Sequence, residues 1–554
     1  MNNILEEIRS FLSDKEAILT PIKCSFDNYE NKISSLELLS GFTGSSGIAI
    51  VSKTNAILCV DGRYTTQARK QTDQKIWKIE QSPQYSVENM IRDVMSAGDT
   101  LVVSLLAHSY KSYLKILEIT KSIDVNVRSI IEHPITRYKE NGYNENRIVV
   151  MDDWHEMDTS DGAILTASKD TISWIFGIRK EKLGNDKSPL VNAIALISET
   201  GKPVIFSDLP IANNNNNKFD YHPFDSFEQV MLEFKNYTIK ANYSQIPAFF
   251  LVNLLKSGFN IVSDQKTHRL YTKTDSEIEA EKYGAFETSI SFIKLLAHVD
   301  YLMKTGHKIS EKEAVAMFKN PKAIDFSFKP ICASGKNTAL VHYTDGDTSN
   351  YIIENEALFL FDAGFHFDNS TTDMTRVLYF GDNCPQEFKN VYTTVLKSVI
   401  FYSMSIFPEN TECSSLDTIS RYYMWKHNMD YDFGTGHGIG NYRWVHESPR
   451  IAKESKDQMK CGMVTSIEPG YYTENYGIRL ENMLLTVHAP NGMLQFEVLT
   501  YVPFCNNLID KSLLGLDEIE WLNNYNSEIL QKFVPIFQDD DISMAWVKEN
   551  TSAL

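Results

Sequence analysis

Two features that guide many functional assignments, paired cysteines and long apolar runs, are scarce in this sequence of 554 residues. Its seven cysteines are scattered without a C-x-x-C pair, so neither a disulfide framework nor a cysteine zinc site is indicated. No stretch of about 18 uncharged apolar residues occurs, and the N-terminal segment lacks the apolar run of a signal peptide. We therefore expect a cytoplasmic protein with no membrane partner.

Basic residues are also in short supply. The chain has 54 Lys and Arg against 72 Asp and Glu, a formal net charge of −18, and acidity on this scale repels nucleic acid. No nucleic-acid partner is expected.

The signatures G-x-S-x-G and H-E-x-x-H are missing, so a serine hydrolase and a zincin lack their usual evidence. The glycine cluster "GTGHGIG" fails the dinucleotide-binding spacing G-x-G-x-x-G.

The order of apolar runs in the N-terminal half predicts two related α/β domains. Near the N-terminus, "GIAIV" and "AILCV" have the composition of strands around a short turn, and "NAIALISETGKPVIFSD" repeats this pattern further along. We place the two domains at residues 1–137 and 138–268. The run of asparagines from Asn213 to Asn217 is expected to be a surface loop insertion.

A third domain is predicted for residues 269–554. It begins with a long amphipathic helix near Thr274, where Ser276 and Glu279 of "SEIE" have the spacing of a capping box. Helices and strands then alternate, and residues 521–534 form a further helix. The chain as a whole is therefore expected to be an α/β (α+β) protein.

Four carboxylates and one imidazole in the third domain stand at strand ends, in turns or inside strands. Asp362 ends the run "ALFLF" and Asp373 opens "DMTRVLYF", so a strand-loop-strand excursion can bring them together. His437 lies among glycines, which would let imidazole and substrate approach closely. Glu468 precedes Pro-Gly. Glu481 lies in "IRLENMLLTV", where a carboxylate must face solvent, a partner charge or a metal. This oxygen-rich set without thiolates predicts a two-metal site that favours Mn²⁺ over a structural zinc.

The segments "FDAG…TTDMTRVLYF", "GTGHGIG…VHESP", "SIEPGYY" and "GIRLEN" resemble the motifs of the metal-dependent peptidases of pita-bread fold. Within them the chain is most similar to the long cytosolic Xaa-Pro aminopeptidases, because "SGFTGSSG", "DGRY", "ISWIFGIR" and "WLNNYN" also match that family. The resemblance spans most of the chain. It implies two creatinase-like N-terminal domains and a pita-bread catalytic domain.

The resemblance also implies a role for each of the five residues. Asp362 and Asp373 would bind one metal ion, and Asp373 and Glu481 would bridge. His437 and Glu468 would hold the other ion. The implied cofactors are two divalent ions, with Mn²⁺ expected first and Zn²⁺ or Co²⁺ as alternatives. Glu468 would in addition serve as general base and acid.

Further residues are assigned to the substrate by the same resemblance. His342 of "LVHYTD" and His446 of "VHESP" would donate hydrogen bonds to substrate carbonyls or to the tetrahedral oxyanion; from the sequence alone, each would be read as a surface histidine. Arg479 and Phe433 would also contact substrate. Phe433 departs from the family, which commonly reads "HGTGHG" where this chain reads "FGTGHG". An aromatic face can pack against a proline ring but cannot donate a hydrogen bond, and the alternative is simple core packing behind the glycine turn.

The activity that the resemblance implies is hydrolysis of the N-terminal Xaa-Pro bond by a hydroxide that bridges two metals, acting on peptides with proline in second position, in a homodimer. Prolidase, which cuts Xaa-Pro dipeptides, shares the fold and ligands but has one N-terminal domain, whereas 361 residues precede Asp362 here. Methionine aminopeptidase lacks the two-domain front. Non-catalytic pita-bread binding modules have lost metal ligands that this chain retains.

Overall fold

A computed structural model describes residues 2–22, 33–138, 146–151, 155, 162–184, 187–198, 202–212, 218–264, 271–343 and 351–554. The chain forms two compact units. The first comprises residues 1–185 with 189–269, and the second comprises residues 186–188 with 270–554. The expected loop at 213–217 and the expected boundary at 268/269 lie outside the described residues.

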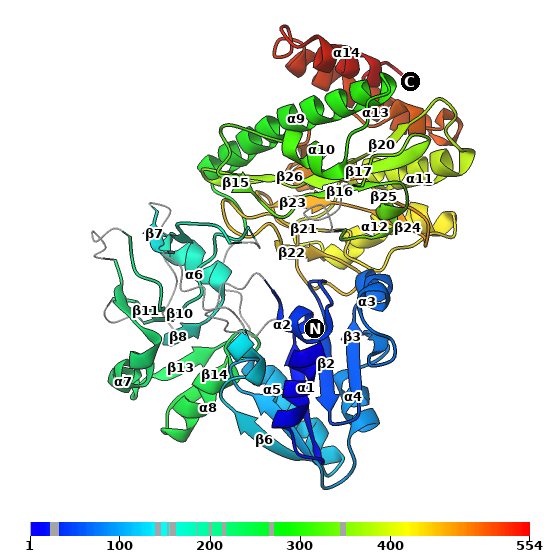
Figure 1. The fold of residues 1–554 in the computed structure, drawn as a ribbon. Helices are drawn as coiled ribbons and strands as arrows, with labels where there is room; N and C mark the ends of the chain where they lie inside the picture. The colour runs from blue at the N-terminus through cyan, green and yellow to red at the C-terminus, as the bar shows by residue number, and fades with distance from the viewer. Residues whose placement is uncertain are drawn as a thin grey trace. The chain divides into compact units, whose positions relative to one another are not determined.

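The first unit begins with a six-stranded sheet whose middle strands are buried (Figure 1). Strand β1 pairs antiparallel with β2 and parallel with β5. The other pairs are antiparallel β2–β3, parallel β3–β4 and parallel β5–β6. In spatial order the strands are β4 (Lys78–Gln81), β3 (Ala56–Val60), β2 (Ile48–Ser52), β1 (Glu16–Pro21), β5 (Thr100–Ser104) and β6 (Asn126–Ile130). The helices are α1 (Asn2–Phe11), α2 (Ser35–Ser40), α3 (Thr65–Gln71), α4 (Val87–Val94) and α5 (Tyr110–Ser122).

A second six-stranded sheet in the same unit repeats this topology strand for strand. Its order is β12 (Asp220–His222), β11 (Val204–Phe206), β10 (Ile194–Ile197), β8 (Ala163–Thr166), β13 (Thr238–Ala241) and β14 (Asn260–Ser263), with matching directions. Its helices are α6 (Lys169–Phe176), α7 (Phe227–Met231) and α8 (Ala248–Lys256), and β7 (Ile148–Val150) pairs with β9 (Ile178–Lys180). The repeat confirms two related α/β folds, whereas the boundaries at 137/138 and 268/269 stay predictions.

The second unit is built around two sheets that share one hydrophobic core. The three-stranded sheet has the order β16 (Ile331–Ser334), β17 (Ala357–Ala363), β20 (Met374–Phe380). The five-stranded sheet has the order β22 (Glu447–Ile451), β21 (Gly436–Gly438), β23 (Val464–Ile467), β26 (Asn482–His488), β27 (Leu494–Val498). Smaller sheets are β15 (Asp325–Phe326) with β18 (Phe365–Phe367) and β19 (Ser370–Thr371), and β24 (Gly470–Tyr472) with β25 (Gly477–Arg479).

Helices cover these sheets, and the long α9 packs against the C-terminal α14 (Figure 1). The helices are α9 (Asp275–Lys304), α10 (Glu311–Met317), α11 (Gln386–Ser403), α12 (Cys413–Lys426), α13 (Leu516–Phe533) and α14 (Asp541–Asn550). The predicted helix over 521–534 is confirmed as part of α13, which begins five residues earlier and ends one residue earlier. None of the described helices combines the length and the apolar character that a membrane crossing requires.

The start of α9 differs from the prediction by two residues. Thr274, rather than Ser276, is the N-cap: its hydroxyl accepts from the Glu277 backbone N–H at 3.3 Å, and the Glu277 carboxylate accepts from the Thr274 N–H at 2.9 Å. The sequence "TDSEIE" contains two overlapping capping boxes of equal local quality. The predicted box of Ser276 with Glu279 is thus wrong, because Thr274 and Glu277 already form the capping box at the N-terminus of α9.

Candidate metal centre

The first two predicted carboxylates lie on paired strands of the three-stranded sheet. Asp362 stands on β17 opposite Thr375 of β20, and Asp373 directly precedes β20, so the chain makes the predicted strand-loop-strand excursion. On the other face of β17, Phe361 packs edge-on against Phe292 and Phe318, with ring centroids 5.4 and 5.1 Å away. Because side chains alternate along a strand, burying Phe361 in the core directs Asp362 to the opposite face.

The other three residues come from the five-stranded sheet and its ends. His437 lies on β21, Glu468 follows β23, and Glu481 immediately precedes β26. The backbone N–H of Glu468 donates to the Thr435 carbonyl at 2.7 Å. A bridge between Thr375 and Glu481 joins the two sheets. All five predicted side chains are therefore carried by neighbouring strands.

The structure brings these five side chains into one cluster. Asp362, Asp373 and Glu481 offer oxygen atoms within 4.8 Å of one another, and so do the ligand atoms of His437, Glu468 and Glu481. His437 Nε2 lies 3.5 Å from an Asp373 oxygen and 3.4 Å from a Glu468 oxygen. The two groups share Glu481, which is the arrangement that two adjacent ions with a bridging carboxylate require.

The electrostatics of the cluster call for a cation. Burial, followed by repulsion from neighbouring carboxylates, raises the pKa of Asp373 and of Glu481 well above the ordinary range. Burial also raises the pKa of Asp362, against the lowering effect of Arg479. Desolvated carboxylates at such distances cannot all stay ionised without a positive partner. A pair of divalent ions would supply that charge.

His437 is prepared to accept a cation. Burial lowers the pKa of its imidazole to about 4, so the ring is neutral near pH 7. Its Nδ1 lies 3.0 Å from the Gly438 carbonyl oxygen, which assigns the proton to Nδ1. The lone pair on Nε2 then faces Asp373 and Glu468. Metal-binding histidines are usually oriented in this way, by a hydrogen bond from the ring nitrogen that does not bind the metal.

Two buried carboxylate oxygens of the cluster lack a hydrogen-bond partner among the described residues. They are Oδ1 of Asp362 and Oε1 of Glu481, whose residues are 6% and 1% exposed. Leaving a buried charged acceptor unpaired costs free energy that native structures normally avoid. These orphaned oxygens, together with ligand groups that contain no cysteine among the described residues, fit an oxygen-preferring divalent ion.

Residues behind the cluster hold Glu481 in place. Thr375 Oγ1 donates to Glu481 Oε2 at 2.8 Å. Arg376, fully buried, donates to the Glu481 backbone carbonyl at 2.7 Å, and it also reaches the Val502 carbonyl and the Tyr525 hydroxyl of α13. Helix α13 is thereby connected to the backbone of a predicted metal ligand.

Arg479 makes its contacts with the protein rather than presenting a free guanidinium. One nitrogen donates to Asp362 Oδ2 at 2.5 Å, and another donates to the Tyr472 hydroxyl and, at 3.2 Å, to the Val341 carbonyl. The residue is 2% exposed. Arg479 is thus a partner of Asp362, and the substrate contact that the resemblance assigned to it stays a prediction.

The glycines around His437 make room for neighbouring backbone. A Cβ atom on Gly436 would lie 2.1 Å from the Ser466 carbonyl oxygen, and one on Gly438 would lie 2.2 Å from that of Ser448. Strand β21 can lie between β22 and β23 at this distance only without side chains there. Packing against neighbouring backbone is thus one reason for these glycines, and the expected approach of imidazole and substrate stays a prediction.

The three remaining predicted residues surround the cluster to different degrees. The ring of the exposed His446 lies 4.3 Å from that of His437, and His446 forms a further close group with His437 and Asp373. Phe433, half-buried, packs against Tyr431 and Tyr472 at centroid distances of 4.9 and 5.8 Å. His342, also half-buried, lies in a turn beside Val341 and belongs to none of the close groups.

Three residues at this site were not singled out from the sequence: Thr375, Arg376 and Tyr472. Thr375 and Arg376 occur within the quoted segment "TTDMTRVLYF", and Tyr472 within "SIEPGYY". An arginine inside an otherwise apolar strand was the available signal, because a charge buried there needs several partners. Nothing local distinguishes Thr375 or Tyr472 from other strand residues.

Comparison with known proteins assigns this site to a class. Residues 291–488 match metallopeptidase family M24, residues 492–554 match the C-terminal region of peptidase_M24, and residues 29–133 match the creatinase/prolidase N-terminal domain. The chain is therefore similar to metallopeptidase family M24 over residues 291–488, which form the C-terminal pita-bread domain, and it has an N-terminal domain of the creatinase/prolidase type.

Particular relatives extend over nearly the whole chain. "Probable Xaa-Pro aminopeptidase P" of Paracoccidioides brasiliensis (strain Pb03) is 29% identical, covering 94% of this chain and 93% of its own. The protein of the same name from Pyricularia oryzae is 29% identical, covering 93% and 92%. The X-prolyl aminopeptidase of Caenorhabditis elegans, described as a cytosolic enzyme with a di-nuclear active site, has a TM-score of 0.89 at 25% identity over 99% of each chain.

Proposed function

We propose that this protein is an Xaa-Pro aminopeptidase that removes the first residue from peptides with proline in second position. The observation that carries the proposal is the buried cluster of four carboxylates and one neutral imidazole, with two orphaned carboxylate oxygens. The likeness to Xaa-Pro aminopeptidases over almost the full chain supports the choice of substrate. That likeness includes both N-terminal α/β folds, whereas a prolidase has only one N-terminal domain.

Two divalent ions, Mn²⁺ first and Zn²⁺ or Co²⁺ as alternatives, would be held by the cluster. Asp362 and Asp373 would hold one ion. His437 and Glu468 would hold the other, with Asp373 and Glu481 shared between them. When bound, the ions would polarise the scissile carbonyl and acidify an attacking water. Arg479 would keep the Asp362 carboxylate turned toward its ion through the hydrogen bond at 2.5 Å.

Proton transfer would be the work of Glu468, whose carboxylate lies at the edge of the cluster beside His437. It would accept a proton from the attacking water and pass it to the proline nitrogen that leaves. His446, exposed next to His437, would donate a hydrogen bond to the oxyanion. His342 would do the same for a substrate carbonyl. An Xaa-Pro bond has no amide N–H and a fixed φ, which is why a dedicated site is needed.

Phe433 would give this enzyme an apolar wall in place of the family's histidine. It is half-buried between two tyrosines, and its ring approaches Gly470, where a Cβ would lie 3.3 Å from it. Contact made equally in ground and transition states affects KM rather than kcat. Phe433→Ala should therefore raise KM. A Phe433→His variant whose kcat rises more than about tenfold, 1.4 kcal/mol of transition-state stabilisation, would show that the lost histidine mattered.

A cytoplasmic location and a homodimeric state complete the proposal. The location is supported by the description of the Caenorhabditis elegans enzyme as cytosolic. The dimer rests on family resemblance and is tested by sedimentation of the purified protein.

The experiment that tests the activity compares Xaa-Pro-Yaa tripeptides with Xaa-Pro dipeptides, with added Mn²⁺ and after chelation. We expect release of the first residue from tripeptides, loss of activity on chelation, and recovery with Mn²⁺. Cleavage of dipeptides alone would indicate a prolidase. Full activity in the chelated protein would contradict the metal-dependent mechanism.

A further inference from the structure

A buried ion pair lies beside the candidate metal centre without belonging to it. Lys273 Nζ and Glu447 Oε1 are 2.6 Å apart, and their side chains are 2% and 1% exposed. Burying two charges costs desolvation that their attraction often fails to recover, so such a pair is weak evidence for stability. The pair is therefore better explained by the residues that it holds in place than by a gain in stability.

Glu447 is the residue directly after His446 and the first residue of β22. It pairs with Gly438, the neighbour of His437, where the register between β21 and β22 shifts. A Cβ on Gly440 would lie 2.5 Å from Glu447 Oε2, so the carboxylate fills space that this glycine leaves open. Constraining the Glu447 side chain therefore constrains the end of the loop that carries His446.

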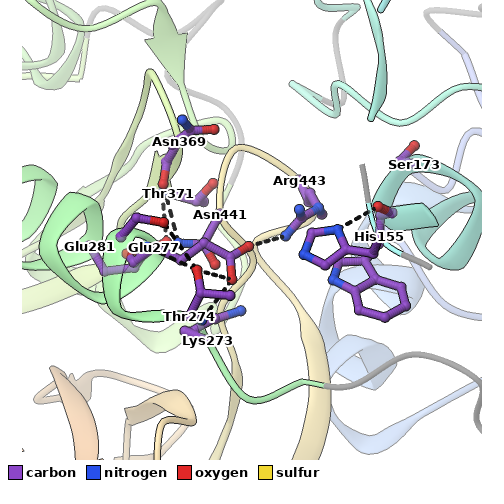
Figure 2. Close-up of polar contacts among 12 residues, drawn as sticks. His155, Ser173, Lys273, Thr274, Glu277, Glu281, Asn369, Thr371, Asn441 and Arg443 are labelled. Carbon is purple, nitrogen blue, oxygen red and sulfur yellow. Dashed lines mark hydrogen bonds and ion pairs between the residues drawn. The ribbon is translucent and has the colours of Figure 1, made fainter. Parts of the chain in front are cut away.

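Lys273, the partner of Glu447 in the ion pair, lies just before α9. Its backbone N–H donates to the Gly462 carbonyl at 2.8 Å. Two further contacts connect the first turn of α9 to the same loop, as Figure 2 shows: Arg443 Nη1 donates to Glu277 Oε1 at 3.2 Å, and Asn441 Nδ2 donates to the Glu277 carbonyl at 3.1 Å. Residues at the start of α9 thus hold the loop from 438 to 447 at three positions, which are Asn441, Arg443 and Glu447.

The same loop and helix α9 also contact the segment before Asp373. Asn441 Nδ2 donates to the Asn369 carbonyl at 3.2 Å. Glu281, fully buried, accepts from Ser370 Oγ at 3.3 Å and from the Thr371 N–H at 3.4 Å. Burial raises the pKa of Glu281 well above its usual range, and the Lys273 ammonium partly opposes this. Lys273 therefore interacts electrostatically with carboxylates on both sides.

We propose that Lys273 and Glu447 are positioning residues for the peptidase reaction, holding His446 in the orientation in which it contacts substrate. The proposal rests on the proposed function. It does not make either residue a metal ligand or a substrate contact: the pair acts through the peptide bond that joins Glu447 to His446. The 4.3 Å separation of the His446 and His437 rings is the geometry that the pair maintains.

A double-mutant cycle tests this coupling. Lys273→Met is made in the parent enzyme and in His446→Ala, and kcat on an Xaa-Pro-Yaa peptide is measured with metal content verified. We expect kcat of the parent to fall by about tenfold or more, since small misplacements of a reacting group carry costs of this size. In the His446→Ala background the same change should cost less than about twofold, because coupled residues are non-additive. Equal losses in both backgrounds would overturn the proposal.

Two further variants separate positioning from folding. Lys273→Met with Glu447→Met removes both charges, which avoids leaving one buried and unpaired; we expect it to fold and to show the same loss of kcat. Lys397→Met breaks a comparable pair with Glu518, 2.7 Å long and 12% and 9% exposed, between α11 and α13. It should leave kcat unchanged. Full activity in the first variant, or an equal loss in the second, would contradict the proposal.

A readout independent of activity is the rate at which diethyl pyrocarbonate modifies His446 in the metal-loaded protein, followed by peptide mass spectrometry. A loop that is no longer held by the ion pair opens locally more often. We therefore expect Lys273→Met to increase the rate of His446 modification by about threefold or more, and Lys397→Met to leave it unchanged. An unchanged rate in Lys273→Met refutes the positioning role. A parent enzyme that does not cleave Xaa-Pro bonds refutes the proposed function instead, and this reactivity measurement still decides the positioning role.

Discussion

Replacing Thr375 by valine keeps the shape of a buried strand residue while removing the hydroxyl that donates to Glu481 Oε2 at 2.8 Å. A hydrogen bond to a charged group contributes about 1.5–3 kcal/mol. If that free energy orients Glu481 for metal binding, its loss weakens affinity roughly tenfold to 150-fold, at about 1.4 kcal/mol per factor of ten. Losses of about 10–100-fold are usual for partners of metal ligands. Activity measured at limiting Mn²⁺ should fall in parallel.

The assay is competition for Mn²⁺ against a chelating dye, with circular dichroism to verify the fold. Thr486→Val is a matched control: Thr486 is a fully buried threonine on β26 whose hydroxyl donates only to the Met459 sulfur, at 3.3 Å, among the described residues. Because sulfur is a weak acceptor, this control should keep its metal affinity. Unchanged affinity in Thr375→Val, or an equal loss in both variants, would refute the reasoning.

Three further predictions concern the cluster itself. Glu481→Ala and Asp373→Ala should lose metal and activity together, since each carboxylate is shared between the two ions; metal analysis showing full occupancy with near-normal turnover would contradict this. His446→Ala should retain metal while turnover drops by roughly two orders of magnitude, whereas His437→Ala should lose metal, and equal metal loss in both would show that the two roles are wrongly divided. The stabilisation that Mn²⁺ confers should also depend on pH. Because burial and repulsion raise the pKa of Asp373 and Glu481, the folded metal-free protein binds more protons than the unfolded chain above the ordinary carboxyl pKa of about 4, and its stability falls as pH rises through that window. Metal replaces those protons, so the increase in Tm on adding Mn²⁺ should be larger near pH 7 than near pH 5; an equal or smaller increase at the higher pH would oppose this account.

The composition of the cluster could be anticipated from the sequence because its members break local patterns. Glu481 interrupts an apolar run, and Asp362 and Asp373 stand at the ends of apolar runs that already indicate strands. The structure brings these side chains together because β17 and β20 pair and because Thr375 bridges to Glu481. Their roles as metal ligands stay predictions until metal is measured.

What the sequence could not indicate depends on long-range packing. Arg376 donates to Glu481, Val502 and Tyr525, which all lie more than 100 positions away, so no window of sequence reveals these partners. The choice of Thr274 over Ser276 as N-cap is likewise undecided locally, although Glu277 of the chosen box also binds Arg443. The glycines around His437 show that space is needed, but only the paired strands show that backbone occupies it.

The central claim, that this cluster holds two metal ions, is tested most directly by crystallography of the Mn²⁺-loaded protein with anomalous scattering at the manganese edge. The account predicts two peaks in each chain. One should lie among Asp362, Asp373 and Glu481, and the other should be contacted by His437 and Glu468 together with the shared Asp373 and Glu481. A single peak, or peaks that these carboxylates do not contact, would contradict it.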